Sequence, residues 1–296
     1  MDDTRYYAFQ SRWSEPAEFA PLLAPLSAGA PAVVEAVAGL VLHPVLVARR
    51  GVTPHAGSGD DAESRTVREL LRRVLARDGR PLAAARAPER RFIGTCRDYA
   101  LLVCSVLRHQ GIPARLRVGF ADYFVPGFHE DHWLCEYRDG AGWRLADGEL
   151  DAATRREYGV AFEAWDVPRD RFLTAGQAWR AVRRGALAPE RFGVSFIGLS
   201  GAWFVGGSVL RDLAALNKQE LLPWDYWGLA RHLAPGSGVP DAVAARLDAL
   251  AGVVAAEPPD PAAVRAAYDG DEAVRVPAVV RSFPRGGPLD VDLTAM

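Results

Sequence analysis

Four local signals between residues 95 and 147 constrain the fold of this chain more than any other feature. Thr95 and Asp98 have the spacing of a capping box, which places Thr95 at the N-cap and Cys96 at the first helical position. This helix is predicted to stop at Gly111, because Pro113 lies just beyond it. The sequence therefore predicts a helix that begins at a cysteine.

Strand signals follow this helix. Residues 114–120 alternate apolar and polar side chains, which predicts a strand with one buried face. After a loop, a second strand is predicted to begin at His132, and Asp139-Gly140 is a strong hairpin signal before a third strand, Trp143 to Asp147. One helix and a small antiparallel sheet are expected here.

The length of the hairpin loop decides how the second and third strands pair. A two-residue loop, Asp139-Gly140, places His132 directly opposite Asp147, with Cβ atoms about 5 Å apart. A four-residue loop, Asp139 to Gly142, places Asp147 opposite Leu134 and diagonal to His132, on the same face. Both registers bring an aspartate near a histidine.

The rest of the chain is expected to be mainly helical. Residues 14–48 look helical up to a break at His43-Pro44, and an amphipathic helix follows Val67. Two short helices are predicted over 241–256 and 261–268. The fold class is therefore α+β. We expect three parts: an N-terminal helical extension (1–60), a core (61–165) and a C-terminal, mainly helical extension packed on the core (166–296).

Cys96 is the candidate for chemistry because of its place at a helix start. A thiol is nucleophilic as the thiolate, and an ordinary cysteine with a pKa of about 8.5 is only slightly ionised at neutral pH. Unpaired N–H groups of a first helical turn favour the thiolate, and a neighbouring histidinium favours it further. A histidine held by an aspartate, such as His132 with Asp147, could act as the base.

The motifs GTCRDYALLVCSVLRHQGIPARLRVGF, DHWLCEY and WRLADGELD together resemble the core of the transglutaminase-like superfamily. The resemblance covers roughly 60 residues. It implies a papain/transglutaminase-like core, in which a catalytic helix packs on an antiparallel sheet and helices are added at both ends. It implies Cys96 as nucleophile, His132 as base and acid, and Asp147 as the residue that orients His132. Trp133 is a candidate for shielding the site or contacting substrate, with an ordinary place in the core as the equal alternative.

The resemblance also implies a reaction: acyl transfer or hydrolysis at an amide or related carbonyl through a thioester on Cys96. The partners would be a small-molecule, peptide or protein acyl donor and an amine or water acceptor, with no cofactor. The Cys96 backbone N–H is the natural first donor to the oxyanion. Two alternatives remain: an amine acyltransferase that takes its acyl group from a thioester carrier, and a catalytically idle scaffold or binding module.

Composition limits the other classes of function. A net charge of −2 gives no reason to expect binding to nucleic acid or to an acidic membrane surface. Three cysteines without a CxxC pair do not predict a disulfide scaffold or a zinc site, and His129 with His132 is a weak metal pattern. Glu149 and Asp151 are expected at the surface or in a turn, although either could replace Asp147. We expect a cytoplasmic protein with reduced thiols.

Overall fold

The computed structural model describes residues 3–140 and 142–295. The chain forms two compact units, each made of two segments. Unit 1 comprises the described residues of Met1–Leu116 and Trp133–Arg169, and unit 2 those of Arg117–His132 and Asp170–Met296. Strands β3 (Ala114–Ala121) and β4 (His129–Asp139) contribute residues to both units. The division of the chain into three parts at residues 60 and 165 stays a prediction, and residues 1, 2, 141 and 296 of those parts lie outside the described residues.

Unit 1 is built around helix α6 (Cys96–His109), whose residues Cys96 to Arg108 are all buried. Helices on the N-terminal side contact it: α1 (Asp3–Ala8), α2 (Ala20–Leu23), α3 (Ala30–Ala38) and α5 (Val67–Arg77). The remaining elements of unit 1, apart from its segments of β3 and β4, are β1 (Val41–Leu42), α4 (Pro44–Arg49), β2 (Phe92–Ile93), β5 (Gly142–Ala146) and α7 (Ala152–Tyr158). Strands β1 and β2 pair in parallel.

Helix α6 packs on strand β4 within unit 1. The thiols of Cys104 on α6 and Cys135 on β4 are hydrogen-bonded, and both side chains are fully buried. This contact confirms the prediction of a helix packed on a sheet. Both cysteines are packing residues of the core, and burial raises the pKa of the Cys135 thiol far above its usual range.

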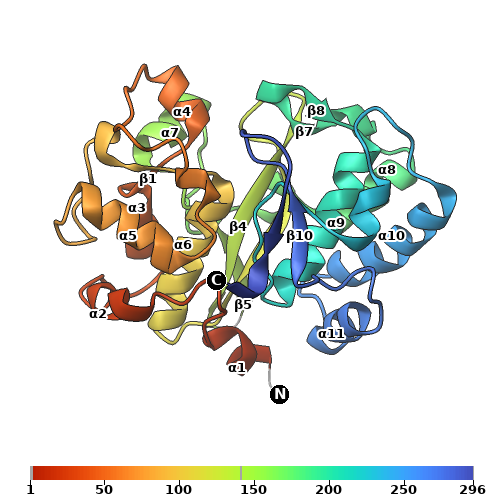
Figure 1. Cartoon of the computed structure of the whole chain (residues 1–296), viewed down its shortest axis with the longest axis horizontal. Coiled ribbons are helices and arrows are strands. Elements are labelled where there is room, and N and C mark those ends of the chain that lie inside the picture. Colours follow the sequence, from red (N-terminus) through yellow and green to blue (C-terminus); the bar gives the residue numbers. More distant parts are fainter. Residues whose placement is uncertain (1–2, 141, 296) are drawn as a thin grey trace. The chain divides into compact units, whose positions relative to one another are not determined.

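Unit 2 is built around helix α9 (Ala202–Leu216), which is buried from Trp203 onwards. It contacts α8 (Ala175–Arg183), α10 (Asp241–Val254) and α11 (Pro261–Asp269), and Figure 1 shows α8, α9 and α10 side by side. The strands of this unit, besides its parts of β3 and β4, are β6 (Phe172–Thr174), β7 (Phe192–Val194), β8 (Leu199–Ser200), β9 (Asp225–Tyr226), β10 (Val279–Ser282) and β11 (Leu289–Asp292).

The largest sheet has the strand order β6-β3-β4-β7-β8, and β5 also pairs with β4. Pairing of β3 with β6, of β4 with β5 and of β7 with β8 is antiparallel, whereas a short pairing of His129 and Glu130 with β7 is parallel. A separate antiparallel sheet of unit 2 has the order β11-β10-β9. Helices and mainly antiparallel sheets confirm the α+β class. None of the described helices is long and apolar enough to cross a bilayer.

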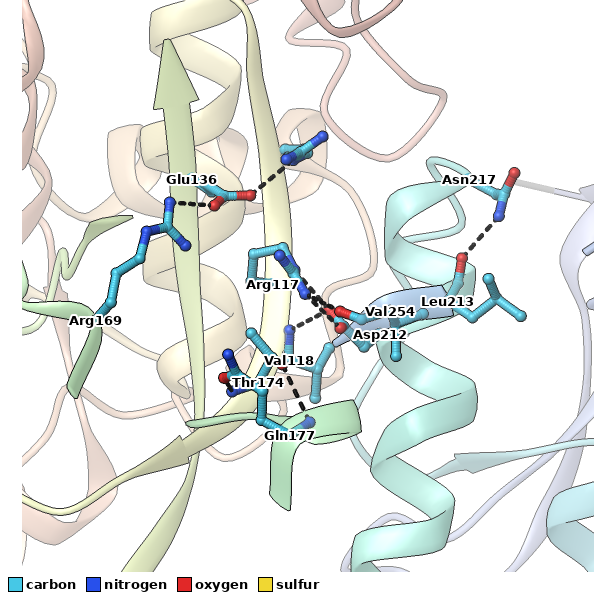
Figure 2. A network of polar contacts seen from close by, with 11 residues as sticks. Arg117, Val118, Glu136, Arg169, Thr174, Gln177, Asp212, Leu213, Asn217 and Val254 are labelled. Carbon is cyan, nitrogen blue, oxygen red and sulfur yellow. Dashed lines mark hydrogen bonds and ion pairs between the residues drawn. The ribbon is translucent and has the colours of Figure 1, made fainter. Parts of the chain in front are cut away.

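Strand β3 departs from its prediction, because all eight of its residues are buried rather than one face. The polar positions are filled by Arg115 and Arg117, and each buried guanidinium has a carboxylate partner. Arg115 Nε lies 2.7 Å from Glu136 Oε2 on β4, and Arg169 binds the other oxygen of Glu136 at 2.6 Å (Figure 2). A buried cation is costly unless a carboxylate compensates its charge. The polar residues of this strand therefore form buried ion pairs and do not face solvent.

Two other boundaries differ from expectation. The predicted helix over 14–48 is broken, because Gly29 adopts a φ of +93° at the start of α3 and a strand, β1, interrupts the segment before α4. Strand β4 begins at His129 instead of His132, since His129 and Glu130 pair with β7. Helices α5, α6, α10 and α11 lie where the sequence predicts them.

Candidate active site

Cys96 occupies the first position of α6. The capping box is present: Thr95 has extended backbone angles, and its N–H donates to Asp98 Oδ2 at 2.8 Å. The cysteine is 7% exposed. At this position the side chain lies beside N–H groups that no helical carbonyl accepts, and the helix dipole favours negative charge there. The location suits a thiolate.

Residues on either side fix the start of this helix. A Cβ on Gly94 would lie 2.9 Å from Asp98 Oδ2 and 2.8 Å from the ring of Phe92, so a larger residue would displace the capping carboxylate. The Arg97 guanidinium donates to Asp98 Oδ1 at 3.1 Å and to the Ser64 carbonyl. Burial nevertheless raises the pKa of Asp98, which shows how strongly this carboxyl is withdrawn from water.

His132 lies in β4 and is 2% exposed. Two consecutive aromatic residues from the preceding loop contact its imidazole. The ring of Phe124 lies 4.9 Å from it, centre to centre, and that of Tyr123 lies 6.1 Å away, both in edge-to-face arrangements. No local signal in the sequence points to these rings, because the segment before His132 is predicted only as a loop.

Asp147 follows β5 directly and is 1% exposed. Its carboxylate accepts the Glu149 N–H at 2.9 Å, and its own N–H donates to the Ala164 carbonyl at 2.7 Å. The next residue packs against α6: a Cβ on Gly148 would lie 3.1 Å from Val103 Cγ2 and 3.2 Å from Tyr99 Cβ. Within unit 1, the chain that carries Asp147 therefore lies against the helix that begins at Cys96.

The register of β4 with β5 follows the longer of the two predicted loops. Cys135 pairs with Ala146 and Asp139 with Gly142, so continuation of the ladder places Asp147 beside Leu134. The register that places His132 directly opposite Asp147 is wrong. Residue 141, within the predicted loop, lies outside the described residues. Cys96 and Asp147 belong to unit 1, and His132 is the last residue of its segment of unit 2.

The other residues considered for the site are the two carboxylates that follow Asp147, the tryptophan that follows His132, and possible metal ligands. Asp151 caps α7 by accepting the Thr154 N–H, so it lies at a helix cap rather than in a turn. Glu149 lies in a turn, as one of its two predicted places, although it is only 6% exposed; its carboxylate lies 3.9 Å from His43 Nδ1. Trp133 is 2% exposed, and its role beside substrate stays a prediction. Among the described residues, no three side chains of the metal-ligand types cluster as a metal site.

Asp131 differs most from expectation. It precedes the predicted start of the second strand at His132, but it lies in β4 and its Oδ1 is buried. Burial raises the pKa of Asp131 to about 6, although the charges of Arg211 and His132 act in the opposite direction.

Comparison with known protein families finds a similarity over part of the chain. Residues 67–148 match the sequence model of the transglutaminase-like superfamily, and the match contains Cys96, His132 and Asp147. This segment is therefore similar to the core of that superfamily, and we refer to residues 67–148 as the transglutaminase-like core. The core begins at the first residue of α5 and ends just after Asp147. Members of this superfamily are in general cysteine-dependent enzymes.

The similarity of this chain to solved structures is weak. A solved structure of a proposed cysteine protease from Cytophaga hutchinsonii aligns with 16% identity and a TM-score of 0.37. The alignment covers 59% of this chain and 46% of that one, so it spans less than half of the other protein. No curated protein matches the sequence.

Proposed function

We propose that the protein is a cysteine-dependent enzyme that transfers or hydrolyses an acyl group at an amide or related carbonyl. Cys96 would be the nucleophile, His132 the base and acid, and Asp147 the residue that orients His132. The observation that carries the proposal is the position of Cys96 at the capped first turn of α6, inside the segment that matches the superfamily. Burial of all three side chains supports it, since a site from which water is excluded strengthens electrostatic interactions.

The first half of the reaction forms a thioester. The Cys96 thiolate attacks the carbonyl carbon, and the negative charge that develops on the carbonyl oxygen is stabilised by the Cys96 N–H at the helix start. Collapse of this intermediate breaks the carbon–nitrogen bond, and the leaving amine or ammonia takes a proton from the His132 imidazolium. The acyl group stays on Cys96 Sγ.

The second half releases the acyl group. Water or an amine attacks the thioester carbon while neutral His132 takes its proton, and the carbon–sulfur bond breaks to restore the thiolate and imidazolium. A buried Asp147 carboxylate, oriented by the Glu149 N–H, would stabilise the imidazolium. The acceptor decides whether the outcome is hydrolysis or transfer.

Alkylation of the thiol tests the nucleophile. We expect a limiting amount of iodoacetamide near pH 7 to label the wild-type protein at Cys96, and Cys96→Ala to abolish that labelling. Cys104→Ala is the matched control, because Cys104 is fully buried in the same helix. Labelling of Cys96→Ala at the wild-type rate would show that Cys96 is not an activated thiol, as a catalytically idle scaffold requires.

Intact mass after exposure to acyl donors tests the reaction itself. Small amides, glutamine-containing peptides and acyl thioesters should be compared, and an acyl adduct on Cys96 is expected with an amide donor. An adduct formed only with acyl thioesters would replace the proposal by an amine acyltransferase that uses a carrier. Absence of any adduct, with Cys96 no more reactive than a free cysteine, would contradict both enzymatic schemes.

A further inference from the structure

The loop between β3 and β4, residues 122–128, contacts His132 through two rings. We refer to these residues as the aromatic loop. Phe124 lies 4.9 Å from the imidazole, with the two ring planes at 65°, and Tyr123 lies 6.1 Å away at 86°. The two rings also contact each other, with centres 4.6 Å apart. The imidazole is therefore bounded by a pair of mutually packed aromatic side chains.

Hydrogen bonds from later segments hold both ends of the aromatic loop. At its start, Asp122 Oδ1 accepts from Arg171 Nε at 2.7 Å, and the Asp122 N–H donates to the Arg171 carbonyl at 3.3 Å. Near its end, Arg191 Nε donates to the Gly127 carbonyl at 2.8 Å. Gly127 has a φ of +77°, a conformation that favours glycine. The loop is thus fixed to residues that follow the transglutaminase-like core.

Rings in this arrangement have two effects on an imidazole. Edge-to-face packing restricts rotation of the His132 ring about its χ2 bond, so each nitrogen keeps its direction. When the face of an aromatic ring meets the edge of an imidazole, it also attracts the cationic form, which stabilises the imidazolium that a thiolate requires as its partner. Phe124 is half-buried whereas Tyr123 is buried, so Phe124 can be substituted with the smaller disturbance to packing.

We propose that Phe124 is a positioning residue for His132, and that Arg171 and Arg191 keep it in place. This inference rests on the proposed function, because it assigns Phe124 a role in the activation of Cys96 through His132. It gives the C-terminal half of the chain a part in the chemistry, since both arginines lie beyond residue 169.

The test is the pH dependence of Cys96 alkylation by iodoacetamide in the full chain. Phe124→Leu is expected to lower the second-order rate about five-fold between pH 6 and 7, from the size of aromatic and cation–π interactions. The rates should converge above pH 9, where the thiol ionises without help. Phe124→Tyr should restore the wild-type profile, because it keeps the ring.

Phe128→Leu is the matched control: it lies in the same loop, it is half-buried, and no contact with His132 is seen among the described residues. Circular dichroism and thermal unfolding should show that all variants fold. Wild-type rates for Phe124→Leu at every pH, or an equal loss in Phe128→Leu, would overturn the inference while leaving the proposed function standing. Failure of the proposed function has a different signature, namely labelling that survives in Cys96→Ala.

Discussion

Arg117 on β3 and Asp212 on α9 form a fully buried, two-pronged ion pair in unit 2. Arg117 Nε lies 3.1 Å from Asp212 Oδ1 and Nη2 lies 2.9 Å from Oδ2, and neither side chain is exposed. The Val118 N–H donates to Asp212 Oδ1, and Arg117 also donates to the Val254 carbonyl (Figure 2). Asp212 follows Arg211 in the sequence, but its carboxylate pairs with Arg117, 95 residues away.

Removal of the charge on Asp212 should destabilise the protein strongly. Asp212→Asn leaves the buried Arg117 guanidinium without a compensating carboxylate, and we expect the free energy of unfolding to fall by about 3–5 kcal/mol. Urea unfolding followed by circular dichroism measures this. Asp269→Asn, at an exposed aspartate of α11, is the control and should change stability by less than about 0.5 kcal/mol. A small effect of Asp212→Asn would contradict the buried ion pair.

Asp131 should make stability depend on pH. Its pKa is higher in the folded protein, about 6 against 3.8, so its contribution to stability is complete below pH 3.8 and lost as the pH rises through 6. Asp131→Asn cannot ionise, so it does not lose this stability as the pH rises. We expect the variant to be more stable than wild type by about 1–3 kcal/mol at pH 8, with little difference near pH 4.

Urea unfolding of both proteins at several pH values isolates the Asp131 contribution, because other titrating groups are shared. Asp290→Asn, at an exposed aspartate of β11, is the control and should give no pH-dependent difference of this size. A constant difference between Asp131→Asn and wild type from pH 4 to 8 would show that burial does not hold the pKa near 6.

Gly119 should not tolerate a side chain. It pairs with Thr174 where β3 meets β6, and a Cβ would lie 2.2 Å from the Leu173 carbonyl oxygen. Gly119→Ala must separate the two strands, so we expect a loss of about 1–3 kcal/mol in urea unfolding. Gly252→Ala, in α10 with no atom within 4 Å of its Cβ, should instead stabilise by about 0.5–1 kcal/mol. Equal changes in stability for the two variants would refute the close approach of β3 to β6 at Gly119.

The capping box of α6 should affect both stability and the reactivity of Cys96. Asp98→Ala removes the acceptor of the Thr95 N–H, and we expect a loss of at least about 1 kcal/mol and slower alkylation of Cys96 near pH 7. The capping box of α8 provides a control, because Gln177 accepts the Thr174 N–H at 2.9 Å. Gln177→Ala should lower stability by a comparable amount and leave alkylation unchanged. Slower alkylation in Gln177→Ala would mean that general destabilisation explains both results.

Elements with local signals could be predicted from the sequence. Helix α6 begins at Cys96 because Thr95 and Asp98 are three residues apart, and α5 follows from its apolar spacing. The segment over 14–48 could not be predicted in this way, since the φ of +93° at Gly29 is not visible in an apolar pattern. The early start of β4 was missed because its partner, β7, lies some 60 residues further along the chain.

The sequence by itself determined where the helix of the transglutaminase-like core starts, which strands follow it, and which three residues are candidates for chemistry. Hydrogen bonds and side-chain spacing over a few residues suffice for these features. Tertiary structure decided which charges are buried and which rings surround His132. Arg115 with Glu136 and Arg117 with Asp212 are partners 21 and 95 residues apart, and a carboxylate so distant cannot be assigned to a guanidinium until the chain has folded around both.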